Sequence, residues 1–280
     1  MGTYLRRLAL TAAITSATCV ANADENIFGY TLGAEVIPVN NLEAQQWVTG
    51  RFGKADGHYA AYDIKTRLDY GVAENTQASL HVNQRVHDYA DVAGRNLSRW
   101  NFSGLQGTLK YMAMSPFLDD YGLAFNFEPG FSLVDRGTGD SRTEINFDTR
   151  VIFQKNFLDN TMIYAANLAP GFDLVRVPQS SGEKEFVSRF TLEFTQGISY
   201  RIMPNWFVGL ENRIHTAAPE FEKFDHVDIA VGPALHYGSE RWWGTLAVLP
   251  QVYGSPSNQG DLDLDRHEKI EVRLKVAYNF

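Results

Sequence analysis

The last fourteen residues decide the fold class: His267-Glu-Lys-Ile-Glu-Val-Arg-Leu-Lys-Val-Ala-Tyr-Asn-Phe280. Apolar and aromatic side chains fall on one parity from Ile270 to Phe280, and charged or polar side chains fall on the other from Lys269 to Asn279, with Ala277 as the one exception. Successive side chains of an extended strand point to opposite faces. The alternation therefore predicts a β-strand with one apolar and one charged face, on which the chain stops at an aromatic residue.

The same two-residue period recurs along the chain, with turn-forming residues between the segments. Crossing a bilayer at a tilt takes about nine to eleven residues, which is the size of these segments. Alternation of this kind, apolar outward and polar inward, is typical of transmembrane β-barrels. The clearest segments are 62–70, 78–87, 144–153, 189–201, 208–215 and 227–237.

The connections alternate between short turns and longer polar loops. The short turns lie near 38–41, 72–75, 115–119, 158–160, 203–205 and 238–240, and the longer loops near 53–57, 89–96, 135–141, 178–183, 217–224 and 254–266. Outer-membrane barrels place short turns in the periplasm and long loops outside. We therefore expect an all-β, antiparallel up-and-down transmembrane barrel of about twelve strands that begins near Glu43–Arg51. Its carboxy terminus would lie in the periplasm.

One further apolar segment, residues 26–38, does not fit this count. It would be a thirteenth strand, and single-chain bacterial barrels use even numbers. We expect it to fold into the lumen or against the periplasmic rim, with a fourteen-strand barrel as the alternative. A soluble secreted or periplasmic all-β protein is a second alternative, but Trp and Tyr residues gather near the expected strand ends, where they favour a membrane interface.

The first 23 residues have the features of a Sec signal peptide. Arg6 and Arg7 precede a short apolar run, and Ala21-Asn-Ala23 supplies the small residues for cleavage before Asp24. The apolar run is too short to span about 30 Å of hydrocarbon. Residues 24–280 would then form one barrel domain. Since the single cysteine, Cys19, lies in the signal segment, the mature chain would have no disulfide framework and no thiolate metal site.

The composition agrees with a membrane barrel and excludes a nucleic-acid partner. Hydrophobic residues make up 44% of the chain, yet its mean hydropathy is −0.26, as expected for a polar lumen within an apolar exterior. The formal net charge is −8, and loss of the two signal-peptide arginines takes it to about −10. Nucleic-acid binding would need a basic patch, which this sequence lacks.

Charged residues of both signs share the inward parity and nearly balance one another. Twelve strands enclose more space than the eight whose side chains can fill the interior. We therefore expect a channel whose charged lumen passes a small polar or charged solute, by passive or facilitated passage. The alternatives are a closed structural or surface-interaction barrel and an outer-membrane lipid-modifying enzyme. The lumen and selectivity candidates are Asp63, Lys65, Arg67, Arg85, Glu144, Asp148, Arg150, Arg189, Glu193, Arg201, Glu211, Arg213, Asp228, Glu271, Arg273 and Lys275.

The sequence offers no catalytic motif, so we expect a protein that is not an enzyme. The outer-membrane phospholipase family carries a His-x-Ser pair, and a nucleophilic serine needs a base within hydrogen-bond reach. No histidine here has serine two residues later. Four histidines on the inward parity have no short ligand spacing, which favours polar lumen residues, and no metal ligand or cofactor is expected. The seven histidines are His58, His81, His87, His215, His226, His236 and His267.

Two features resemble known outer-membrane proteins. The ending with Tyr278 and Phe280 resembles the terminal strand of Gram-negative barrels, which their assembly machinery reads. The segment from Glu25 to Pro38, followed by Gln45-Gln-Trp-Val-Thr49, resembles the start of a family of uncharacterised Gram-negative outer-membrane proteins, and the likeness extends over the mature chain. A weaker likeness is to outer-membrane transporters linked to the degradation of aromatic compounds. The resemblance implies a barrel in the cell outer membrane, with outer-membrane lipid, lipopolysaccharide and the barrel-assembly machinery as partners, but no activity.

Overall fold

The computed structural model describes residues 26–178 and 184–280. The predicted signal peptide lies outside these residues. The described chain forms twelve strands: β1 (Leu42–Phe52), β2 (His58–Ala73), β3 (Thr76–Val92), β4 (Arg95–Met114), β5 (Gly122–Val134), β6 (Ser141–Phe157), β7 (Met162–Pro178), β8 (Lys184–Met203), β9 (Trp206–Pro219), β10 (His226–Gly238), β11 (Trp242–Ser255) and β12 (Ile270–Asn279).

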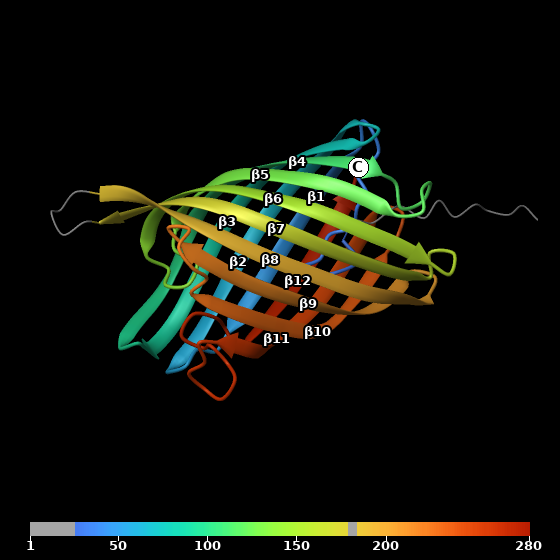
Figure 1. The fold of residues 1–280 in the computed structure, drawn as a ribbon. Helices are drawn as coiled ribbons and strands as arrows, with labels where there is room; N and C mark the ends of the chain where they lie inside the picture. The colour runs from blue at the N-terminus through green and yellow to red at the C-terminus, as the bar shows by residue number, and fades with distance from the viewer. Residues whose placement is uncertain (1–25, 179–183) are drawn as a thin grey trace, which may run out of the picture.

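The twelve strands close into an antiparallel barrel in which each strand pairs with its neighbours along the chain (Figure 1). The last strand closes the ring against the first, in a register that pairs Glu43 with Asn279 and Phe52 with Ile270. Closure leaves no free sheet edge, as a bilayer requires, since water cannot satisfy backbone groups there. The twelve-strand prediction is confirmed, and the ring leaves no place in the wall for the two extra strands of the alternative.

The barrel has an apolar outside and a polar inside. On β12, Leu274 and Val276 are 45% and 41% exposed, whereas Lys275 between them is fully buried. A soluble protein would bury the leucine and expose the lysine, so the exterior suits lipid. Among the described residues, no helix is long and apolar enough to cross a bilayer.

The two ends of the barrel differ, as the loop lengths predict. One end, here called the short-turn end, carries four connections of two to four residues and a longer one at residues 115–121. The other, the long-loop end, carries most of the longer segments (Figure 1). One expectation was wrong: residues 89–96 are not a long loop. β3 and β4 continue past the expected boundary to a tight turn at Ala93 and Gly94, where both residues have positive φ. The hairpin continues beyond the apolar band, where most of its side chains are polar. A polar stretch of sequence is expected both for such a hairpin and for a loop, so the sequence pattern does not distinguish the two.

The amino-terminal segment, residues 26–38, lies inside the lumen in its short-turn half and belongs to no strand. Side chains of the wall satisfy its backbone in place of a partner strand. The Glu211 carboxylate accepts hydrogen bonds from the amides of Gly29 (2.8 Å) and Tyr30 (2.9 Å), and Asn167 both donates to and accepts from the backbone of Leu32. The sequence analysis expected residues 26–38 to lie in the lumen or against the periplasmic rim, and the structure has them in the lumen. Because wall side chains satisfy its backbone, this apolar extended segment does not add a strand to the barrel.

Candidate functional site

The lumen contains a cavity of about 440 Å³ between the amino-terminal segment and the loop that joins β5 to β6. Its lining comes from strands around the barrel and includes Tyr30 and Leu32 of the segment and Arg136 of the loop. Pockets that hold small molecules measure about 300–1,000 Å³. The cavity is therefore large enough for a small polar molecule.

The segment of residues 26–38 forms the floor of the cavity. Tyr30 lies under the guanidinium of Arg273, with the cationic carbon 3.7 Å from the ring centroid, and its hydroxyl donates to Glu271 Oε2 at 2.7 Å. Lys275 donates to the Phe28 carbonyl at 3.1 Å. These contacts tie the floor to the side chains of β12.

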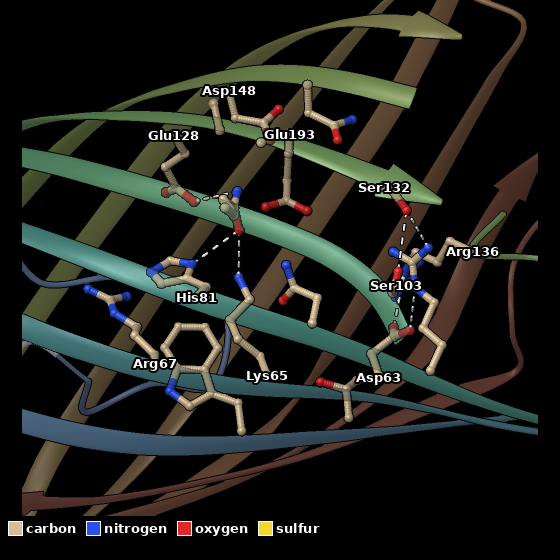
Figure 2. A pocket seen from close by; sticks show the side chains of 18 of the residues that line it. Asp63, Lys65, Arg67, His81, Ser103, Glu128, Ser132, Arg136, Asp148 and Glu193 are labelled. Atoms are coloured by element: carbon tan, nitrogen blue, oxygen red, sulfur yellow. Dashed lines mark hydrogen bonds and ion pairs between the residues drawn. The ribbon is translucent and has the colours of Figure 1, made fainter. Parts of the chain in front are cut away.

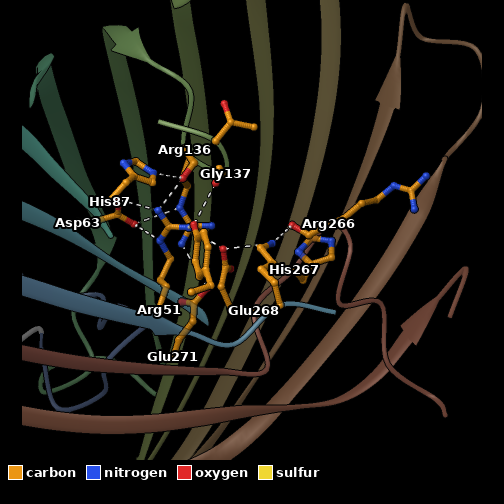
Figure 3. A network of polar contacts seen from close by, with 12 residues as sticks. Arg51, Asp63, His87, Arg136, Gly137, Arg266, His267, Glu268 and Glu271 are labelled. Carbon is orange, nitrogen blue, oxygen red and sulfur yellow. Dashed lines mark hydrogen bonds and ion pairs between the residues drawn. The ribbon is translucent and has the colours of Figure 1, made fainter. Parts of the chain in front are cut away.

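The β5–β6 loop, residues 135–140, folds inward and forms the roof (Figure 3). The Arg136 guanidinium lies 3.2 Å from both Asp63 Oδ2 and Glu271 Oε1, and its carbonyl accepts a 2.6 Å hydrogen bond from Arg51. Arg51 is itself buried and pairs with Glu268 at 2.6 Å. Arg136 therefore holds the loop to two carboxylates of the wall, and Arg51 holds the loop backbone from below.

Two acids outside the strands are held ionised by their neighbours. Burial opposes ionisation of Glu268, but Arg51, Lys54 and Arg136 hold the pKa of its carboxyl below the usual range. Burial likewise opposes ionisation of Asp135, whereas Arg142 and hydrogen bonds within the loop lower the pKa of that carboxyl. The roof is therefore an ionic structure at neutral pH.

The walls of the cavity carry opposite charges (Figure 2). Glu128, Asp148 and Glu193 lie together on the side of β5, β6 and β8, while Lys65 and Arg67 of β2 face them. Arg150 on the acidic side lies 3.6 Å from Glu193, so carboxylates still outnumber cations there. On the basic side, four cations surround the ring of Trp47 at centroid distances of 4.1 to 6.0 Å: Lys65, Arg67, Arg273 and Lys275.

The structure divides the predicted lumen candidates into those that line the cavity and those that hold its surroundings together. The former are Asp63, Lys65, Arg67, Arg85, Glu144, Asp148, Arg150, Glu193, Arg213 and Arg273. Of the others, Glu211 and Lys275 bind the amino-terminal segment, Glu271 pairs with Arg213 and Arg136, and Arg189 pairs with Glu144 and Asp173. Arg201 donates to the Asn160 carbonyl near the short-turn end, away from the cavity.

Three residues that shape the cavity were not candidates in the sequence. Tyr30 and Arg136 lie outside the alternating strands, so no parity assigns them to the lumen. Trp47 is on the inward parity of β1, but the lumen candidates were chosen for their charge, so an aromatic residue was not among them. Asp228, the remaining lumen candidate, lies beside His215 and His267. The spacing of these two histidines along the sequence did not indicate that they would meet.

The sequence and the fold both have relatives. Residues 20–280 match the model described as Family of unknown function (DUF6662). No curated protein matches the sequence. The solved COG4313 outer membrane channel from Pseudomonas putida F1 is 11% identical, with a TM-score of 0.56 over 88% of this chain and 98% of that one. The solved NanC porin is 12% identical, with a TM-score of 0.52 over 85% of this chain and 98% of that one. At these identities the likeness shows the fold alone, which is that of outer-membrane barrels.

Proposed function

The chain belongs to the family of unknown function whose model it matches, and from its lumen we propose that it is an outer-membrane channel for a small polar or charged solute. The observation that carries the proposal is the cavity of about 440 Å³ inside a closed twelve-stranded wall, with carboxylates on one side and cations on the other. Its structural neighbours include an outer membrane channel and a porin, which supports the same reading.

The opposed charges favour a solute that carries both signs. An ion of one sign is attracted by one wall and repelled by the other, so net charge alone gains little. A zwitterion can turn its cationic group toward Glu128 and Glu193 and its anionic group toward Lys65, replacing part of its hydration shell with protein groups. We therefore propose small zwitterionic or strongly dipolar molecules as the preferred class.

The floor and the roof would act as gates. Both are held to the wall by side-chain contacts rather than by strand pairing, so either can move while the ring of backbone hydrogen bonds stays intact. The channel would rest in a narrow state and open when residues 26–38 or 135–140 shift. The short-turn end and the carboxy terminus would face the periplasm, with the long loops among the lipopolysaccharide.

Single-channel recording in a planar bilayer tests the proposal. Mature protein, residues 24–280, is refolded in detergent, and conductance and reversal potential are compared for Glu193→Gln, Lys65→Gln and the wild type. Asp88→Asn serves as the matched control, because Asp88 is an exposed acid near the long-loop end of β3. In about 1 M salt, where the screening length is about 3 Å, the rim charge has little influence on the lumen.

The expected result is discrete steps from the wild type and opposite changes in ion preference from the two lumen variants. Loss of the Glu193 charge shifts the preference toward anions, and loss of the Lys65 charge shifts it toward cations. If both lumen variants behave like Asp88→Asn, current does not pass through this cavity and the proposal fails. If neither the correctly folded wild type nor Gly29→Val, which displaces residues 26–38, passes current, the closed structural barrel is supported instead.

A further inference from the structure

Four potential metal ligands meet at the long-loop end of the barrel. His215 belongs to β9, His226 and Asp228 to β10, and His267 to the loop between β11 and β12, beside Glu268 (Figure 3). One ligand atom from each residue lies within 4.8 Å of all the others. Strand pairing explains the approach of His215 to Asp228, which are cross-strand partners, but it does not explain the arrival of His267.

The distances match a tetrahedral ion. His215 Nδ1 and His267 Nδ1 each lie 3.3 Å from Asp228 Oδ1, and His226 Nε2 lies 3.4 Å from His215 Nδ1. Zinc–nitrogen bonds of about 2.0–2.1 Å place neighbouring ligand atoms of a tetrahedron about 3.3–3.4 Å apart. The remaining pairs of ligand atoms lie within 4.8 Å of one another.

The surrounding residues orient the ligands. His226 Nδ1 contacts Asp225 Oδ1 at 2.6 Å, which leaves Nε2 as the atom aimed at the cluster. A carboxylate behind a ligating histidine fixes its tautomer and strengthens it as a ligand. Asp228 Oδ1 is buried and accepts no hydrogen bond among the described residues, although two imidazole nitrogens lie beside it. The other oxygen, Oδ2, lies 3.6 Å from the Arg213 guanidinium, so Oδ1 is the atom left to bind an ion.

An ion can reach this cluster from the cavity. The side chains of His215 and His267 keep 28% and 13% of their exposure, and both residues line the cavity, whereas Asp228 is only 2% exposed. Three imidazoles and one carboxylate suit zinc and its neighbours in the first transition row, while calcium and magnesium prefer oxygen ligands.

We propose that His215, His226, Asp228 and His267 bind one zinc-class divalent ion. The ion joins the β11–β12 loop to β9 and β10. Because Glu268, the next residue, pairs with Arg51 under the roof, the ion fixes the same loop at a second point. The proposed site does not rest on the proposed channel function, since metal binding requires only the folded barrel.

Direct binding measurement tests the site. Refolded mature protein without a histidine tag is titrated with Zn²⁺ by calorimetry, and Co²⁺ is added to a second sample to record the visible absorption of a tetrahedral complex. The variants are His267→Gln and His226→Gln for the ligands and Asp225→Asn for the orienting carboxylate. His58→Gln is the control, because His58 is exposed at the start of β2 and outside the cluster.

We expect one Zn²⁺ per chain, a tetrahedral Co²⁺ spectrum, and an affinity that falls more than about tenfold in each ligand variant and about tenfold in Asp225→Asn. Zn²⁺ should also raise the unfolding temperature of the wild type but not of His267→Gln. A heat-modifiable gel band shows that each variant folds. Absence of Zn²⁺ and Co²⁺ binding to the folded wild type, or equal binding by His267→Gln, would overturn the site. In that case, a simple hydrogen bond between His215 and His226 accounts for their contact.

Discussion

Tyr30 donates its hydroxyl hydrogen to Glu271 with 2.7 Å between the two oxygens, although 241 residues separate them along the chain. The other carboxylate oxygen of Glu271 lies 3.2 Å from Arg136. One buried acid on β12 therefore contacts both the floor and the roof of the cavity. The floor and the roof therefore share one carboxylate as a contact, which links them physically.

The Tyr30–Glu271 hydrogen bond should appear as a coupling energy in a double-mutant cycle. Tyr30→Phe keeps the ring beneath Arg273 and removes only the hydroxyl, while Glu271→Gln removes the charge. A hydrogen bond to a charged group contributes about 1.5–3 kcal/mol, so we expect a coupling of at least about 1 kcal/mol in urea unfolding followed by tryptophan fluorescence. The same cycle with Glu222→Gln, an exposed loop acid, should be additive. Additivity in both cycles would show that the hydrogen bond contributes nothing to stability.

The amino-terminal segment should keep its place in the lumen only if residue 29 has no side chain. A Cβ at this position would lie 2.4 Å from the Ala247 Cβ and 2.9 Å from Glu211 Oε1, so Gly29→Val must push the segment away from β9 and β11. We expect larger or more frequent conductance steps, with the barrel wall still folded. Val39→Ala, in the exposed connection to β1, is the matched control and should conduct like the wild type. Unchanged conductance of the valine variant would mean that the segment does not limit current.

Acid should loosen the roof through Glu268. The pKa of its carboxyl is lower in the folded protein than in the unfolded chain, where it is about 4.3. The stabilisation is therefore complete above the unfolded pKa and is lost as the pH falls through the folded pKa. Unfolding midpoints measured between about pH 6 and pH 3 should fall more for the wild type than for Glu268→Gln. Glu222→Gln should follow the wild type, and identical profiles for all three proteins would contradict this role.

The terminal aromatic pair should matter for assembly rather than for stability. Phe280 is 73% exposed and packs edge-on against Tyr278, with ring centroids 5.2 Å apart. Deleting Phe280 removes little from the lumen, so we expect refolding in detergent to proceed as in the full chain. In cells, the deletion should reduce the amount of heat-modifiable barrel in the outer membrane, whereas Phe224→Ala in an exposed loop should not. Equal loss in detergent and in cells would indicate a structural role instead.

The parts of the lumen that lie on strands followed from the sequence, and the parts that lie on loops did not. The period of β12 alone places Glu271, Arg273 and Lys275 inward, and the structure has them there. The same rule says nothing about Arg136, because a loop has no parity. Nor could loop length reveal the extended hairpin of β3 and β4, since polar residues can continue a strand outside the apolar band.

By itself, the sequence determined the class of fold, indicated about twelve strands and assigned a face to the residues of the clearest strands, while the closed ring decided between twelve and fourteen. It could do so because alternation is a local property and a bilayer demands closure of the ring. Tertiary structure alone decided which charges face each other across the cavity, where residues 26–38 lie, and that His267 joins His215, His226 and Asp228. Those contacts join residues far apart along the chain, and they depend on how side chains fill a closed space, which no local period encodes.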